Sequence, residues 1–309
     1  MAAPSPEVSL ELPVEGAPTA RSLVLDLLAT LRGGSMPVAA LVAAAALFGI
    51  PAGSVRVALT RLVASERVVR DRRGHYRLGP ATRAVEARIA SWRDPESRRI
   101  AWDGGFAAVL DGVAAPAAAT GAGARRARAR ALRLLGFRTL RPGLHLRPDN
   151  LRGGMSGLRL ELSALGLPEG DAVVRLSEID AHAGARLREL FDVRALAAAE
   201  TALRQELERS LRRLDRLPPD RARVESFLLG GRAIRTLVLD PLLPEEIAPG
   251  DARRALAETL RRYDRAGRAA WRPFLARFGL PGLPTPVDAR MEESVGAGSP
   301  ARSPGGGVR

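Results

Sequence analysis

The sequence contains no cysteine and no lysine, and its three histidines, His75, His145 and His182, are far apart. The absence of cysteine excludes disulfides, thiolate metal sites and cysteine nucleophiles. The absence of lysine excludes the G-x-x-x-x-G-K-[ST] phosphate loop, and the chain also lacks G-x-S-x-G and a strand-linked G-x-G-x-x-G. The histidine spacing is not that of a zinc site, which needs paired ligands. We therefore expect no enzyme, no metal and no cofactor.

Long hydrophobic runs are also missing. The longest, from Pro37 to Ile50, is about 14 residues and rich in alanine, whereas a membrane helix needs about 20. It follows Arg32, Gly33 and Gly34 and not a basic N-terminus with a cleavage site, so it is not a signal peptide. We expect a buried helix here and a soluble, cytoplasmic protein.

Arginine is abundant. All 48 basic residues are arginines, against 34 acidic residues, which gives a formal net charge of +14. Such an excess predicts attraction to a polyanion, although an arginine-rich coding bias would produce part of it without any function. With 309 residues, of which 46% are hydrophobic, the chain is large enough for two or three globular domains. Turn-forming residues at the two ends predict a disordered leader over 1–18 and a disordered tail over 281–309.

The segment 19–90 reads as a DNA-binding domain. Apolar residues recur at helical spacing from Thr19 to Leu31, from Pro37 to Leu47 and from Ser54 to Ala64. Two short alternating segments follow, 68–70 and 75–78, and the glycine late in the link between them suits a hairpin. Three helices followed by a hairpin predict a winged helix-turn-helix.

The third helix of this domain carries the candidate base-reading residues. Val55, Leu59 and Leu62 form an apolar stripe, so the opposite face is predicted to enter the major groove, where arginine reads guanine. The alternative is an ordinary helix with solvated arginines. The candidates for DNA contact are Ser54, which we expect at a phosphate, and Arg56, Val57, Thr60 and Arg61.

The hairpin adds a second group of candidates. The stretch from Ser54 to Leu78 holds seven arginines against Glu66 and Asp71, so charge concentrates where this fold meets DNA. Around the hairpin tip we expect phosphate or minor-groove contacts, and the alternative is protection of an edge strand by charge. The residues concerned are Arg70, Arg72, Arg73 and His75.

The segment 91–192 is predicted to be a ferredoxin-like domain. Its pattern reads strand–helix–strand–strand–helix–strand, with the first strand at Phe106 to Leu110 and the last at Ala172 to Leu176. Eight arginines between Arg125 and Arg147 offer a second nucleic-acid surface or a clamp for CoA phosphates, but their spacing winds around a helix and favours solvated side chains.

Asp111 supports a rival hypothesis, a metal-dependent nuclease. It follows the first strand, where spacer-integration proteins that share the ferredoxin-like fold place a metal-linked carboxylate. Cleavage of a phosphodiester needs several oxygen ligands, and no second acid lies near Asp111 in the sequence. A turn residue is the preferred interpretation.

The segment 193–280 is predicted to be a helical bundle. Leucines recur every three to four residues from Leu196 to Leu214, which fits either a dimer seam or a buried bundle helix. The overall prediction is therefore an α+β protein of three parts.

Several strings resemble the PaaX-like family, the repressors of the phenylacetic acid catabolon. They are "TARSLVLDLL" from Thr19, "GIPAGSVRVALTRLVA" from Gly49, "YRLG" from Tyr76, "WDGGF" from Trp102, "LLGFRTLRPGLHLRP" from Leu134 and "LVLDPLLPEEIAP" from Leu237. The resemblance implies a homodimeric repressor that binds a double-stranded DNA operator and is released by an aryl-CoA or acyl-CoA effector. The residues that would bind the effector are not identifiable from the sequence.

Overall fold

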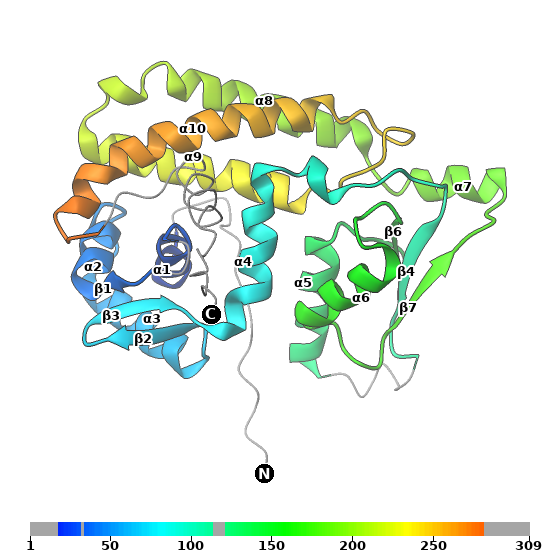
Figure 1. Ribbon diagram of the computed structural model, residues 1–309, viewed down its shortest axis with the longest axis horizontal. Coiled ribbons are helices and arrows are strands. Elements are labelled where there is room, and N and C mark those ends of the chain that lie inside the picture. The colour runs from blue at the N-terminus through cyan, green and yellow to red at the C-terminus, as the bar shows by residue number, and fades with distance from the viewer. Residues whose placement is uncertain (1–17, 32–33, 114–120, 281–309) are drawn as a thin grey trace, which may run out of the picture.

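The computed structural model describes residues 18–31, 34–113 and 121–280 (Figure 1). Two small antiparallel sheets and a majority of helix confirm the predicted α+β class. The predicted disorder of the leader and the tail falls outside the described residues, apart from Pro18. Among the described residues, no helix is both long enough and apolar enough to cross a bilayer.

The N-terminal part contains three helices and a three-stranded sheet. Helix α1 begins after Thr19, whose hydroxyl and the Ser22 hydroxyl cap the helix reciprocally. The turn after α2 contains Gly49 at a φ of +71°, a left-handed conformation that glycine adopts without strain. The elements are α1 (Ala20–Ala29), β1 (Met36–Pro37), α2 (Val38–Ala46), α3 (Ala52–Ala64), β2 (Val68–Arg72) and β3 (His75–Leu78), with sheet order β1-β3-β2.

A connecting segment that the sequence did not predict follows the hairpin. It consists of α4 (Arg83–Ala90) with short 3-10 helices on either side, and α4 lies between the N-terminal part and the central part that follows it in the chain (Figure 1). Its side chains Val85 and Arg88 are buried, so the helix is part of the protein interior.

The central part has the predicted alternation of strands and helices. The sheet order is β5-β6-β4-β7, with every neighbouring pair antiparallel. Strand β4 is buried on both faces: Ala107 and Val109 pack in the largest hydrophobic cluster, and Phe106 and Ala108 pack in another. The elements are β4 (Phe106–Leu110), α5 (Ala122–Leu134), β5 (Arg138–Arg141), β6 (Leu144–Pro148), α6 (Gly154–Ala164), β7 (Ala172–Leu176) and α7 (Ala181–Arg188).

Three long helices complete the described chain: α8 (Val193–Leu211), α9 (Pro219–Leu239) and α10 (Asp251–Ala276). They run side by side along the top of the molecule (Figure 1). Leu203, Leu207 and Leu211 of α8 pack inside this bundle. Intramolecular packing therefore explains why leucine recurs every three to four residues over this part of α8. A dimer seam on α8 stays a prediction.

Helix α10 belongs to two hydrophobic clusters. Its first half packs in the bundle through Leu256 and Leu260. Its last turns bring Trp271, Phe274 and Leu275 into the cluster that forms the core of the N-terminal part. The bundle and the N-terminal part are therefore joined by shared apolar packing.

Two buried arginines join the central part to the bundle. Arg88 of α4 donates hydrogen bonds to the carbonyl oxygens of Leu134 and Val238, and Arg147 of β6 donates to those of Leu135 and Pro241. Burial lowers the pKa of both guanidinium groups to about 9. Both remain protonated at neutral pH and bind carbonyls at the C-terminal ends of α5 and α9, where helix dipoles favour a cation.

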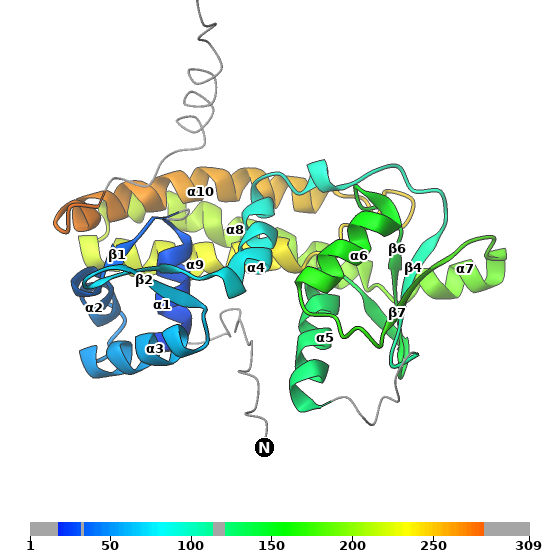
Figure 2. The same cartoon turned by 60° about the horizontal axis from the view of Figure 1, so that its bottom comes forward.

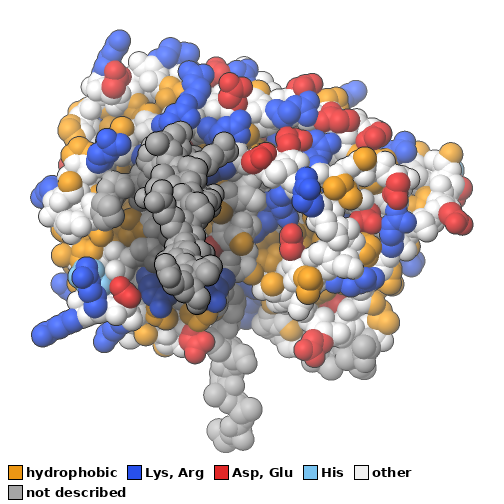
Figure 3. Space-filling model, in the orientation of Figure 1, with side chains coloured by type: hydrophobic (Ala, Val, Ile, Leu, Met, Phe, Trp, Pro, Cys, Tyr) orange, Lys and Arg blue, Asp and Glu red, His pale blue; other side chains and the backbone are white. Residues whose placement is uncertain are grey.

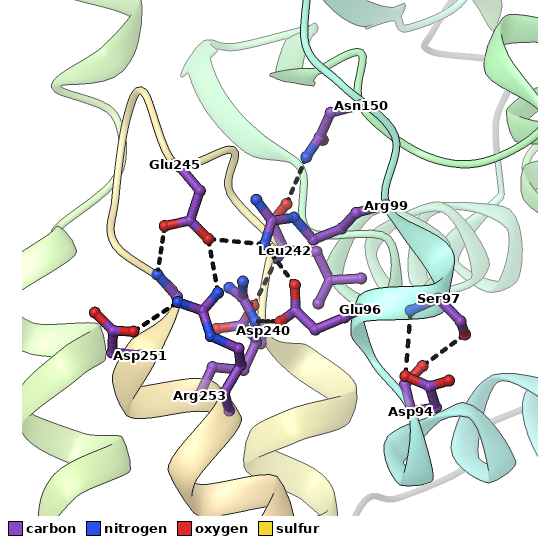
Figure 4. A network of polar contacts seen from close by, with 12 residues as sticks. Asp94, Glu96, Ser97, Arg99, Asn150, Asp240, Leu242, Glu245, Asp251 and Arg253 are labelled. Atoms are coloured by element: carbon purple, nitrogen blue, oxygen red, sulfur yellow. Dashed lines mark hydrogen bonds and ion pairs between the residues drawn. The ribbon is translucent and has the colours of Figure 1, made fainter.

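A polar network fixes the segment between α4 and β4 against the loop between α9 and α10 (Figure 4). Arg253 donates from Nε to Glu96 over 2.8 Å and from Nη1 to Asp240 over 3.2 Å. Arg99 donates to Glu96 and also reaches Glu245, at 2.6 and 3.3 Å. The connecting segment is thus held by charge-assisted hydrogen bonds as well as by apolar packing.

Candidate nucleic-acid interface

Helix α3 presents a polar face away from the core. Val55, Leu59 and Leu62 are 0 to 3% exposed and pack against α1 and α2. This helix lies at the outer edge of the N-terminal part, with one side turned away from the other described elements (Figure 2). All five predicted residues on this side are exposed: Ser54, Arg56, Val57, Thr60 and Arg61.

The side chains on this face are available to a partner. Neither Arg56 nor Arg61 has an ion-pair partner within the described part of the chain. The Thr60 hydroxyl donates to the Arg56 carbonyl oxygen over 3.1 Å, which leaves its lone pairs free to accept. Val57 is 53% exposed and is one of several large apolar side chains at the surface. The helix begins at Ala52, one to two residues earlier than expected, so Ser54 lies within its first turn.

The hairpin places a second set of arginines at one corner of the molecule. Arg70, Arg72 and Arg73 are exposed, and blue side chains project over β2 and β3 at the lower left of Figure 3. Strand β2 continues to Arg72, two residues beyond the predicted end, so the turn itself is Arg73 and Gly74.

His75 has a different position from the other hairpin candidates. It is half-buried, and its Nδ1 lies 3.2 Å from the Arg73 carbonyl oxygen while its Nε2 lies 3.2 Å from Nη2 of Arg72. Because arginine only donates, Nε2 accepts and Nδ1 donates. The ring therefore orients the Arg72 guanidinium within the hairpin.

One of the seven arginines in this segment does not contribute to the surface. Arg67 is 0% exposed, and its backbone is held by hydrogen bonds from its N–H to Leu62 and from the Gly79 N–H to its carbonyl. Gly79 is required at this contact, because a Cβ at Gly79 would lie 2.0 Å from the Glu66 carbonyl oxygen.

The arginines of the central part do not form one surface. Arg128 is buried and donates to both carboxylate oxygens of Asp171 over 2.5 Å. Arg130 donates to the Leu165 carbonyl oxygen over 2.9 Å, and Arg147 is buried. These three side chains stabilise the fold instead of facing a ligand.

Asp111 takes part in the same ion-pair cluster. Its carboxylate lies 3.1 Å from Nη1 of Arg128 and 3.2 Å from Nε2 of His145. No second acid lies near Asp111 in the sequence, but in the folded protein Asp171, 60 positions further along the chain, binds the same Arg128 guanidinium. Among the described residues, no group of three or more histidine or acidic side chains is placed to hold a metal.

A cavity of about 680 Å³ is a feature that the sequence did not predict. It lies where α1 and α4 meet α9 and α10, and its lining is mainly apolar. Helices α1 and α4 are far from α9 and α10 in the sequence, so no local signal indicates the space between them.

Helix α3 and the β2–β3 hairpin thus carry exposed arginines and are joined to an α+β body. Residues 19–81 match the family model described as PaaX-like protein, which confirms the predicted resemblance for this segment. A solved structure, the uncharacterized protein Rv0674 from Mycobacterium tuberculosis, is similar with 25% identity and a TM-score of 0.50, over 82% of this chain and 98% of the other. No curated protein matches the chain.

Proposed function

We propose that this protein is a transcriptional regulator that binds double-stranded DNA through α3 and the β2–β3 hairpin. The observation that carries the proposal is the division of α3 into a buried apolar stripe and an exposed face with Arg56, Thr60 and Arg61. Arginine in the major groove donates two hydrogen bonds to guanine, and Val57 is suited to contact a thymine methyl group.

Residues 19–90 are assigned in this proposal to a winged helix-turn-helix domain, with α3 as its recognition helix. The order of three helices and a hairpin supports this assignment. The strand order β5-β6-β4-β7, with α5 and α6 as connections, supports a ferredoxin-like domain over 91–192, and the three long helices support a bundle over 193–280.

The finer functional assignment extends the PaaX-like resemblance. We propose a cytoplasmic homodimeric repressor of a catabolic operon, with one recognition helix per half-site and half-sites about one helical turn apart. An aryl-CoA or acyl-CoA releases it from the operator. A hundredfold loss of operator affinity requires a coupling free energy of about 2.7 kcal/mol, which is ordinary for allosteric proteins.

A gel-shift titration tests DNA binding. The probe is the region upstream of the protein's own gene, and a shuffled duplex of equal length and composition is the reference. We expect the upstream region to bind about a thousandfold more tightly than the shuffled duplex at physiological salt. Equal affinity for the two duplexes would contradict a sequence-specific regulator.

A matched variant distinguishes recognition from overall charge. Arg141 is exposed on β5, away from α3, so Arg141→Ala removes the same charge as a substitution on α3. Arg141→Ala is expected to keep wild-type preference, whereas Arg56→Ala is not. A panel of acyl-CoA thioesters added to the same titration tests the effector.

A further inference from the structure

A second cavity, of about 340 Å³, lies where the central part meets the bundle. This volume is at the lower end of the range of about 300–1,000 Å³ that is usual for ligand sites, so the cavity has room for a small molecule. The end of α5 and the start of β5 form one wall, and α8 and the end of α9 form the others. The ionisable side chains that line it are Arg133, Arg138, Glu200 and Asp240.

The two arginines of this cavity have no anionic partner of their own. Arg133, in the last turn of α5, is exposed and makes no hydrogen bond or ion pair within the described part of the chain. Arg138 is half-buried, donates from Nη1 to the Phe137 carbonyl oxygen over 3.1 Å and lies over the Phe191 ring. Burial lowers the pKa of Arg138, and the nearby charge of Arg133 adds to this effect. Two guanidinium groups so placed are suited to bind a carboxylate or a phosphate.

The carboxylate of Asp240 does not neutralise these arginines, because residues outside the cavity already bind it. Its Oδ1 accepts a hydrogen bond from Nη1 of Arg253 over 3.2 Å and another from the Leu242 N–H over 2.7 Å. Figure 4 shows Asp240 inside this network, beside Arg253. The charge of Asp240 is therefore balanced by Arg253, and the cavity keeps the positive charge of Arg133 and Arg138.

Glu200 of α8 contributes an unsatisfied acceptor to the same cavity. It is only 5% exposed, and it shares a hydrogen bond with Asp240, which requires one proton between the two carboxyl groups. Burial and the neighbouring Asp240 charge accordingly raise the pKa of Glu200. Its Oε1 atom is buried and accepts no hydrogen bond from an N–H group or hydroxyl of the described residues. Because an unsatisfied buried acceptor is costly, a ligand hydroxyl that donates to Oε1 is favoured.

We propose that this cavity binds a small hydroxylated anion, whose carboxylate or phosphate group accepts from Arg133 and Arg138 and whose hydroxyl donates to Oε1 of Glu200. Apolar side chains of α8 and α9 complete the lining, so the body of the ligand is a short carbon chain: Leu196, Ala199 and Leu239. Because Arg138 belongs to the central part and Glu200 to the bundle, a bound ligand bridges the two and raises the Tm of the protein. The site does not depend on the proposed DNA binding.

Isothermal titration calorimetry of the full chain with matched compounds tests the site. Lactate carries a carboxylate and a hydroxyl, propionate lacks the hydroxyl, and propane-1,2-diol lacks the charge. Propanediol 1-phosphate and propyl phosphate are the corresponding phosphate pair, so the two pairs distinguish a carboxylate site from a phosphate site. We expect at least one hydroxylated anion to bind about tenfold more tightly than both its counterpart without the hydroxyl and the uncharged diol. Equal affinities within both pairs would overturn the site.

Substitutions test the two contacts separately. Arg133→Met removes one guanidinium at an exposed position and should weaken binding of the hydroxylated anion about tenfold. Arg141→Met, at an exposed position of β5 outside the cavity lining, is the matched control and should leave binding unchanged. Glu200→Gln keeps an acceptor oxygen and should keep the preference for the hydroxyl, whereas Glu200→Leu should abolish it.

Each result decides the proposal. Equal weakening in Arg133→Met and Arg141→Met would show a general effect of charge and overturn the site, as would a hydroxyl preference that survives in Glu200→Leu. If Glu200→Leu does not fold, as judged by circular dichroism, the ligand pairs and Arg133→Met decide alone. The titration uses no DNA, so its failure is separate from a failure of the gel shift, which would overturn the proposed function alone.

Discussion

Phe48, in the turn after α2, contacts Phe227 of α9 edge to face, with ring centroids 5.2 Å apart and an angle of 61° between the rings. Phe227 also lies beside Trp271 of α10, with centroids 6.1 Å apart. This aromatic group joins the segment that carries α3 to the three long helices. Its rings also border the cavity, since Phe227 and Trp271 line it.

Removal of the Phe227 ring should destabilise the whole protein. Phe227 is half-buried, so we expect Phe227→Ala to lower the free energy of unfolding by about 2 kcal/mol. A double-mutant cycle with Phe48→Ala should give a coupling of about 0.5–1.5 kcal/mol. Urea denaturation measures both, with the exposed Leu228→Ala as the control. A coupling near zero would mean that the two rings do not stabilise the junction.

Substitutions on α3 and on the hairpin should affect DNA binding in different ways. Arg56→Ala should cost about 1–3 kcal/mol at the operator and relax the sequence preference, because Arg56 lies on the proposed base-reading face. Arg73→Ala should weaken all duplexes alike and reduce the slope of log affinity against log salt by about one. Titrations at several salt concentrations separate the two effects. Equal loss of specificity in both variants would refute this division of roles.

The stability of the protein should depend on pH through Asp26. Its pKa of about 7 in the folded protein lies above the ordinary value of 3.8, so the folded state binds the proton more tightly. Stability is therefore lost as the pH rises from about 4 to about 7, and the loss is complete above that range. Asp26→Asn removes the effect and should be more stable than wild type by about 2 kcal/mol at about pH 8.

Urea denaturation across this pH range measures the difference between wild type and Asp26→Asn. The advantage of the variant should shrink as the pH falls toward 4. Asp215→Asn, at an exposed position, is the control and should follow wild type. A constant difference at all pH values would show that Asp26 is not desolvated.

Arg147 should be essential for the attachment of the central part. It is 2% exposed and donates to the carbonyl oxygens of Leu135, Pro148 and Pro241 and to the Asn150 side chain. Arg147→Met leaves these acceptors unsatisfied, and we expect a loss of about 3 kcal/mol or more. Arg141→Met, on the exposed edge strand, should change stability by less than about 0.5 kcal/mol. Thermal denaturation compares them.

Asp111 should have a structural role. Its ion pairs with Arg128 and His145 lie in a partly buried cluster, so Asp111→Ala should lower stability by about 1 kcal/mol. Labelled duplex incubated with wild type should stay intact with Mg²⁺ and with EDTA. Cleavage that needs Mg²⁺ and disappears in Asp111→Ala would support the nuclease hypothesis instead.

Much of the fold could be predicted from the sequence because most of its elements carry strong local periodicity. The buried stripe of Val55, Leu59 and Leu62 has helical spacing, and the strands 106–110 and 172–176 are observed with the predicted bounds. Helix α4 was missed because 83–90 mixes arginine and alanine without a continuous apolar stripe, and because Arg88 of this helix is buried. Its burial depends on carbonyl oxygens of α5 and α9, distant in the sequence.

The candidate interface was predictable only where local periodicity indicates it. The exposed face of α3 follows from its periodicity, whereas the burial of Arg67 does not, because a charged residue in a basic segment is ordinarily expected at the surface. Asp111 and Asp171 both bind Arg128 only in the folded protein, and the cavity lies between four helices from distant parts of the sequence. Both features depend on tertiary contacts, which a single sequence does not encode as a pattern.

The path of α10 has a consequence for the order of folding during synthesis. Trp271, Phe274 and Leu275 complete a cluster whose other buried residues lie between Leu23 and Val68. A nascent chain released from the ribosome only as far as α9 exposes the apolar surface that these three side chains cover. Chains that stall before α10 are therefore expected to be substrates for chaperones, because the core of residues 23–68 is completed only after α10 has been translated.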